Sequence, residues 1–221
     1  GLQTNANLTI GGFVGGNRGE IDQVAVIGPS TNNPITITTD VSGNSTINAG
    51  GFAGANYTSS GLPAGEIKNA ISNSAITIDQ VNSDYNAAGL SVGGFIGNNE
   101  SLLTNVASSG KIWTRVNWIQ TTTNIGGMVG NNNTTGIITD STTSSEVVLS
   151  APGSTLGNLI PATFSGGQIF VGGLAGGNNG YFDNCCVTGL TNTGSVTMVV
   201  NTNSTVGFTQ IGIGGLFGLY T

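Results

Sequence analysis

The stretch Val92-Gly93-Gly94-Phe95-Ile96-Gly97-Asn98-Asn99 carries the pattern that decides the fold of this chain. In this pattern an apolar residue precedes a Gly-Gly pair, and two apolar residues and a third glycine follow it. An asparagine stands two places after the third glycine. The pattern occurs six times, with Gly-Gly pairs that begin at residues 11, 50, 93, 126, 172 and 214, and only the last copy replaces the asparagine, with Tyr220. A unit that recurs about every forty residues predicts one repeat domain over residues 1–221, in which the units stack on one another.

Short runs with the character of strands lie between the glycine phrases. Ile, Val and Thr recur with period two over residues 20–27, 34–39, 75–79, 111–116 and 195–200, and turn residues separate these runs. No segment carries a sustained helical stripe. The sequence therefore predicts an all-β chain that coils as a β-solenoid (β-helix) of about five coils, with roughly 40 residues and three strands per coil. A β-propeller is the structural alternative, although its blades need four strands and the glycine phrase suits a corner.

Stacking of the units brings equivalent residues of successive coils to about 4.8 Å from one another. The large apolar residue after each Gly-Gly pair is then expected in one core column: Phe13, Phe52, Phe95, Met128, Leu174 and Leu216. The repeated asparagines are expected to form a ladder of side-chain amides. The glycines are expected to keep the corner narrow and to permit positive φ there.

The fifth copy reads Gly172-Gly173-Leu174-Ala175-Gly176-Gly177-Asn178, followed by Asn184-Cys185-Cys186-Val187-Thr188-Gly189 and by Val196. It resembles the GLUG repeat of bacterial and archaeal surface proteins, whose pattern is G-G-L-hydrophobic-G-x-N, then N-[CS]-[YA]-x-[TS]-G, then a valine strand. Weaker copies of the second part lie at residues 69–72 and 105–110, and insertions after residue 56 and between residues 150 and 170 depart from the pattern. The resemblance implies a secreted, β-solenoid-like surface module, outside the cell or on its surface, and it brings no catalytic residues.

Charged residues are scarce in this chain. They make up 6% of it, the net charge is −6, and only four residues are basic: Arg18, Lys68, Lys111 and Arg115. This shortage argues against binding to nucleic acid and to anionic membrane surfaces. No apolar run approaches the 18–20 residues or so of a spanning helix, so we expect no membrane insertion. We also expect the sequence to begin at a mature N-terminus, because no charged and then apolar leader opens it.

The residues that catalysis or cofactors need are absent or scattered. The ten carboxylates belong to different repeats, and Glu20 and Asp22, two residues apart on one strand face, are more typical of a solvated face than of a catalytic pair. There is no histidine and no serine in a nucleophile elbow, and the glycine phrases lack the lysine of a P-loop and the aspartate of a calcium-binding nonapeptide. The sequence predicts no enzyme, no cofactor and no metal site.

Two neighbouring cysteines, Cys185 and Cys186, do not make a disulfide framework or a zinc site. On a strand their side chains point to opposite faces, so we expect one to be a small core residue and the other a surface thiol. A vicinal disulfide and a bond to another subunit are the alternatives.

Several residues are candidates for lateral or glycan contacts. Trp113 and Arg115 share one strand face, and an exposed tryptophan beside an arginine is typical of contact sites and of sugar stacking; cover by a neighbouring loop is the alternative. Leu156, Ile160 and Phe164, in the insertion, could add a lateral contact. Asn44 and Asn203 are the candidate glycosylation acceptors, because the ladder amides would point inward. A threonine face for ice binding is disfavoured, because the Thr36 and Thr38 pair does not recur.

Repeat phrases lie close to both ends of the sequence, and no charged or proline-rich cap accompanies them. The candidate assembly residues are Leu8, Ile10, Phe13, Ile211, Ile213, Leu216, Phe217, Leu219 and Tyr220. Uncapped solenoid ends recruit other chains, and a head-to-tail contact that does not close builds a fibre. The hypothesis is a structural subunit of an extracellular filament or surface appendage, with itself as partner. The alternative is a stalk or glycan-binding segment of a larger cell-surface adhesin.

Overall fold

The computed structural model of this chain describes residues 7–28, 35–39, 46–58, 64–80, 89–116, 122–151, 153–155, 158, 167–187, 195–199 and 210–221. These residues form 27 β-strands and no helix, which confirms the all-β prediction.

The strands fall into five sheets, which we name A to E in the order in which the chain meets them. Sheet A holds β1 (Leu8–Gly11), β6 (Thr46–Gly50), β11 (Gly89–Gly93), β16 (Thr122–Gly126), β21 (Gln168–Gly172) and β26 (Gln210–Gly214). Sheet B holds β2 (Val14–Asn17), β7 (Ala53–Asn56), β12 (Ile96–Asn99), β17 (Val129–Asn132), β22 (Ala175–Asn178) and β27 (Phe217–Tyr220). Sheet C holds β3 (Glu20–Asp22), β8 (Glu66–Lys68), β13 (Leu102–Thr104), β18 (Ile137–Thr139) and β23 (Tyr181–Asp183). Sheet D holds β4 (Ala25–Val26), β9 (Ile71–Ser72), β14 (Ala107–Ser108), β19 (Thr142–Thr143) and β24 (Cys186–Val187). Sheet E holds β5 (Ile35–Thr39), β10 (Ile76–Gln80), β15 (Lys111–Arg115), β20 (Glu146–Ser150) and β25 (Val196–Met198).

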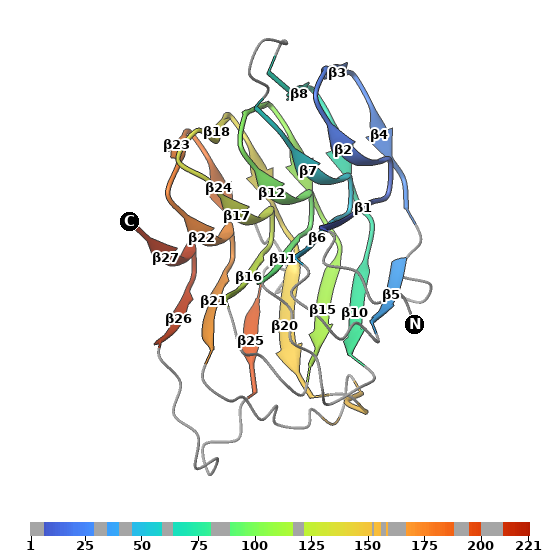
Figure 1. Ribbon diagram of the computed structural model, residues 1–221, viewed down its shortest axis with the longest axis vertical. Coiled ribbons are helices and arrows are strands. Elements are labelled where there is room, and N and C mark those ends of the chain that lie inside the picture. The colour runs from blue at the N-terminus through green and yellow to red at the C-terminus, as the bar shows by residue number, and fades with distance from the viewer. Residues whose placement is uncertain are drawn as a thin grey trace.

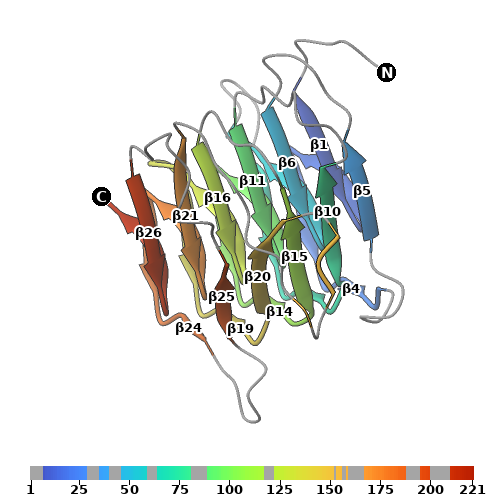
Figure 2. The same ribbon diagram turned by 90° about the horizontal axis from the view of Figure 1, so that it is seen from below.

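Every fifth strand along the chain joins the same sheet, and all pairs among these strands are parallel. Equivalent residues pair in register; Gly50, for example, pairs with Gly11 on one side and with Gly93 on the other. Successive windings lie side by side from the N-terminal to the C-terminal end (Figure 1), with the row of sheet A strands beside that of sheet E (Figure 2). The predicted β-solenoid architecture is therefore confirmed.

The prediction of three strands per coil is wrong, because each unit passes through five sheets. The glycine phrase contributes two strands of its own, one before and one after the corner. The expected strand over residues 20–27 breaks into the short strands β3 and β4.

A left-handed residue produces this break in every unit. The residues between sheets C and D with positive φ are Gln23 (56°), Asn69 (50°), Asn105 (51°), Asp140 (51°) and Asn184 (47°). Asn and Asp adopt this conformation more readily than most side chains. Asn105 Nδ2 donates to Asn69 Oδ1 (2.7 Å) and Asn184 Nδ2 donates to Asp140 Oδ1 (2.7 Å), so these side chains also link neighbouring windings.

The interior consists of two apolar clusters. One lies between sheets A and E and includes Ile47 and Ile76; the other joins sheet B and the corner residues to sheets C and D and includes Phe95 and Leu103. The Gly-Gly corner reaches sheet D on the opposite wall. The backbone O of Gly127 accepts hydrogen bonds there from Ser108 Oγ (2.9 Å) and from Thr143 Oγ1 (3.0 Å).

Sheets A and B leave no room for a side chain at the third glycine of the phrase. A Cβ atom at Gly97 would lie 2.5 Å from the backbone N of Ala49 and 2.6 Å from the backbone O of Gly54. The expectation of positive φ at the glycine corners is wrong, because Gly110 and Gly153 are the described glycines with positive φ and neither belongs to a phrase. Glycine is needed in the phrase because two backbones approach closely.

The repeated asparagines form the predicted ladder in the interior. Nδ2 of each one donates to Oδ1 of the next, at 2.9–3.1 Å, in the order Asn17, Asn56, Asn99, Asn132 and Asn178. All five side chains are buried. The amide also bonds to the local backbone, as Asn99 Nδ2 does to Ser101 O (2.8 Å). Buried amides that are paired in this way make the stacking register specific, because a shifted register would leave them without partners.

The glycine contact gives a first prediction. Gly97→Ala should lower the free energy of unfolding by about 3 kcal/mol or more, because the added methyl group forces two backbones apart. The matched control is Gly19→Ala, since a Cβ atom at Gly19 meets nothing within 4 Å. Chemical denaturation of the two variants measures the difference, and equal stabilities would contradict the close approach of sheets A and B.

A second prediction concerns Thr114, which lies in register with Ile78 and Leu149 in sheet E and is fully buried. Its hydroxyl has no hydrogen-bond partner among the described residues. An unpaired buried hydroxyl costs about 1–3 kcal/mol, so Thr114→Val should raise the free energy of unfolding by about 1–2 kcal/mol in denaturant titrations. Thr142→Val, at a half-buried position, is the control. A loss of stability in Thr114→Val would show that the hydroxyl is satisfied.

Candidate functional site

The residues after the Gly-Gly pairs lie in one row along the solenoid axis. Their backbone N–H groups donate to the carbonyl of the next member at 2.8–3.0 Å, in the order Phe13, Phe52, Phe95, Met128, Leu174 and Leu216. The Phe52 and Phe95 rings are stacked, with centroids 4.7 Å apart and planes at 12°. The four inner members are buried, whereas Phe13 is 54% exposed and Leu216 48%. The row is therefore open to solvent at both ends.

The winding at the N-terminal end presents an unpaired edge in all five sheets, because β1 to β5 each have one strand neighbour among the described residues. Leu8 and Phe13 are exposed and Ile10 is half-buried on this face. The first winding also carries half-buried core residues that the sequence pattern did not identify: Val14, Ile21, Val24, Val26 and Ile35. We call this surface the N-terminal face.

The opposite end, which we call the C-terminal face, is also apolar. Ile211, Ile213, Leu216 and Tyr220 are exposed there, and Phe217 and Leu219 are half-buried. The Phe217 ring packs between the rings of Phe182 (5.1 Å) and Tyr220 (5.5 Å). Sequence reasoning missed the half-buried core residues Phe182, Val187, Val196 and Met198 of this face. Once five strands per unit are known, the repeat spacing places these residues in the winding β21–β25.

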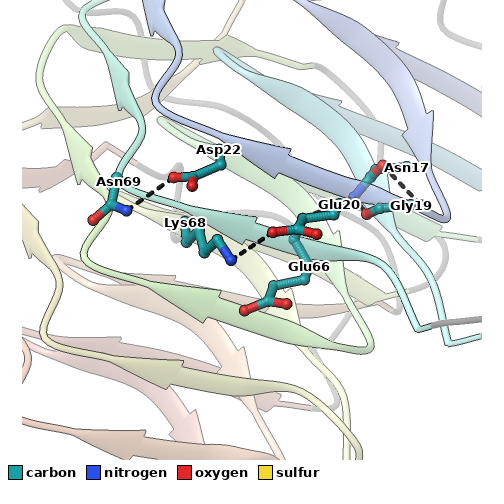
Figure 3. Close-up of polar contacts among 7 residues, drawn as sticks. All are labelled: Asn17, Gly19, Glu20, Asp22, Glu66, Lys68 and Asn69. Atoms are coloured by element: carbon teal, nitrogen blue, oxygen red, sulfur yellow. Dashed lines mark hydrogen bonds and ion pairs between the residues drawn. The ribbon is translucent and has the colours of Figure 1, made fainter.

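A charged cluster lies beside the N-terminal face, on sheet C (Figure 3). Lys68 Nζ lies 2.5 Å from Glu20 Oε1, and Glu66 is the strand neighbour of Glu20. The hydrogen bond to Glu20 raises the pKa of Lys68, and the nearby negative charges add to this effect. Asp22 accepts a hydrogen bond from Asn69 Nδ2 (2.9 Å). An open ion pair of this kind contributes little stability, and a lysine among the carboxylates differs from a converging acid pair.

No group of three or more His, Cys, Asp or Glu side chains among the described residues is arranged to hold a metal ion. The described residues also contain no helix that is long and apolar enough to span a membrane.

Trp113 is half-buried on the outer side of sheet E, and its polar partners belong to the chain itself. Its Nε1 donates to Ser150 Oγ (2.9 Å), and the Lys111 and Arg115 cations lie 4.8 Å and 5.2 Å from its ring. Arg115 is also paired with Asp79 (2.8 Å). The side chains that would meet a glycan are thus partly engaged already. The outer row that contains Trp113 is not a continuous threonine ladder, because Trp113 and Val148 interrupt it: Thr36, Thr77, Trp113, Val148 and Thr197.

Five of the candidate contact and glycosylation residues lie outside the described residues: Asn44, Leu156, Ile160, Phe164 and Asn203. Their roles remain predictions.

The two cysteines are free thiols in different environments. Cys185 is half-buried and packs against the second core cluster, whereas Cys186 is exposed. Burial raises the pKa of the Cys185 thiol.

These environments give a third prediction. Between pH 7.5 and 8.5, iodoacetamide should label Cys186 faster than Cys185, because the thiolate is the reactive species and burial disfavours it at Cys185. The Cys185→Ser and Cys186→Ser variants separate the two rates by intact mass. Unfolding in urea should make the rates similar, and equal rates in the folded protein would contradict the placement of Cys185 against the core.

Comparison of the chain with protein-family models, with curated proteins and with solved structures found no match. The resemblance to GLUG repeats therefore stays a prediction from the motif alone.

Proposed function

We propose that this protein is a structural subunit of an extracellular filament or surface appendage, which polymerises head-to-tail through its solenoid ends. In this proposal the subunit is a β-solenoid of about five coils of roughly 40 residues. The observation that carries the proposal is the state of the two end windings. Both present unpaired parallel strands and exposed ends of the same core column.

The geometry of the ends favours a fibre over a closed dimer. The N-terminal and C-terminal faces are different surfaces, so a contact between them is heterologous. Strand pairing across it would continue the parallel sheets along the same axis, and such a contact does not close.

The energetics require strand pairing in addition to apolar contact. Burial of a half-exposed Leu, Ile, Phe or Tyr contributes about 1–1.5 kcal/mol, so direct contact of the two faces through six such side chains would contribute about 6–9 kcal/mol. The six are Leu8, Phe13, Ile211, Ile213, Leu216 and Tyr220. Association costs about 4–15 kcal/mol in lost freedom, so apolar burial alone does not secure a stable contact. Backbone hydrogen bonds between edge strands are expected to supply the rest and to fix the register.

The alternative, a stalk or glycan-binding segment of a larger cell-surface adhesin, is favoured by one feature. Trp113 presents a half-buried indole flanked by two cations on the side wall. Loss of binding to a glycan array in Trp113→Ala would support this reading.

A fourth prediction tests the filament. Negative-stain electron microscopy of purified chain 1–221 should show regular filaments, and Phe13→Asp should abolish them, because it places a charge on the N-terminal face. Ile137→Asp is the matched control, since Ile137 is 42% exposed on the side wall in sheet C. Isolated short particles from the wild-type chain at high concentration would contradict the proposal.

A further inference from the structure

Among the described residues, the winding at the C-terminal end consists of two strands, one in sheet A and one in sheet B. Sheets A and B hold six strands each, whereas sheets C, D and E hold five among the described residues. We call the surplus strands, β26 and β27 (residues 210–221), the C-terminal arm. Ile211 and Ile213 of the arm continue the core rows of Ile169 and Val171, but they are exposed (54% for Ile213) because no described strand of sheet E lies opposite them.

This surplus conflicts with simple end-to-end stacking. If β1 of the next copy were to pair with β26, sheets A and B would be continuous. Sheets C, D and E would then lack one strand between β23, β24, β25 and the next copy's β3, β4, β5. Such a gap leaves three pairs of strand edges unpaired and keeps apolar residues of both faces in contact with water.

We propose that strands β1 and β2 of the next copy replace the C-terminal arm, and pair with β21 and β22 in the filament. The inference rests on the proposed function and specifies the partner surface: the winding β21–β25 receives the first winding of a second copy. All five sheets are then continuous, with five strands from each subunit. In the single chain the arm covers the place that the neighbour takes.

The side chains of the two segments match at equivalent positions. The core residues Leu8, Ile10, Phe13 and Val14 would take the places of Ile211, Ile213, Leu216 and Phe217. Gly15 would take the place of Gly218, where a Cβ atom would lie 2.4 Å from the backbone N of Val171. The incoming segment therefore has a glycine where no side chain fits.

The buried amide ladder fits strands β1 and β2 of the next copy better than it fits the C-terminal arm. Asn178 accepts from Asn132 Nδ2 (2.9 Å), but the next position along the ladder is Tyr220, which has no amide and is exposed. At the other end, Asn17 Oδ1 accepts from Gly19 N (3.1 Å) and lies at the position that would meet a preceding donor. In the exchanged arrangement Asn178 Nδ2 donates to Asn17 Oδ1 of the next copy, and the ladder continues across the junction.

The balance of interactions favours exchange. In sheets A and B, one pair of strands replaces another, so the backbone hydrogen bonds are conserved. In sheets C, D and E, three new strand pairs form, and the end residues Phe182, Val187, Val196 and Met198 become buried. The arm regains conformational freedom on release. The driving force therefore comes from the three sheets that the arm does not cover.

The first test compares two charge substitutions in the full chain. Leu216→Asp weakens only the arm, so filaments should form at least as fast as from the wild-type chain in light-scattering and electron-microscopy time courses. Phe13→Asp, at the equivalent position of the incoming segment, should prevent them. Loss of filaments in a Leu216→Asp protein that keeps its β-sheet circular dichroism would overturn the exchange, because it would show that the arm itself is the contact.

The second test locks the arm. Gln168 and Gln210 are partners in adjacent parallel strands, whose Cα spacing suits a disulfide. In a Cys185→Ser/Cys186→Ser background, the oxidised Gln168→Cys/Gln210→Cys protein should polymerise at least about tenfold more slowly, because the competent state is no longer populated. Dithiothreitol should restore the rate. Equal rates before and after reduction would refute the exchange and leave the filament proposal standing. Absence of filaments from the wild-type chain, from Leu216→Asp and from the reduced protein would refute both.

Discussion

At the third glycine of every phrase after the first, the backbones of sheets A and B pass so close to each other that one added carbon atom would collide with a peptide nitrogen or oxygen. This contact folds the wall of the solenoid inward, and the corner reaches sheet D, where hydroxyl groups donate to the carbonyl of Gly127. The interior is thereby divided into two apolar clusters that are each narrow enough for small β-branched and aromatic side chains to fill. The five-sheet path of the chain follows from this inward fold.

Register between windings depends on a second group of interactions, the buried ladder of asparagine amides. Apolar side chains of similar size tolerate small shifts along a row, whereas an amide in the interior needs a donor and an acceptor at defined positions. The ladder from Asn17 to Asn178 meets that need in every winding. On the outer wall, left-handed residues such as Asn69 and Asn105 add a second polar row and turn the chain from sheet C to sheet D. The two rows place eight asparagines at positions where their amides link neighbouring windings.

The repeated glycine phrase was sufficient to predict the solenoid and the inner asparagine ladder, because each repeat places the same residue types at the same positions. The number of strands per winding was not predictable in the same way. Strands of two or three residues, such as β3 and β4, are too short to show a period, and the break at Gln23 carries no turn residue. A need for glycine between two close backbones cannot be distinguished in the sequence from a need for positive φ, because both place the same residue at the same position. The open ends could be located from Phe13 and Leu216, but the surplus of two strands required the sheet order.

Every amide of the inner ladder points its donor toward the C-terminal end, and every strand pair in the solenoid runs in the same sense. The molecule therefore carries a direction along its axis. If one copy were inverted, the amide oxygens of the two ladders would face each other at one junction. The strands of the two copies would also be antiparallel, whereas all strand pairs within the solenoid are parallel. Two-fold symmetric pairing through either face is disfavoured for this reason, and any chain of copies joined by these faces has a distinct base and a distinct tip.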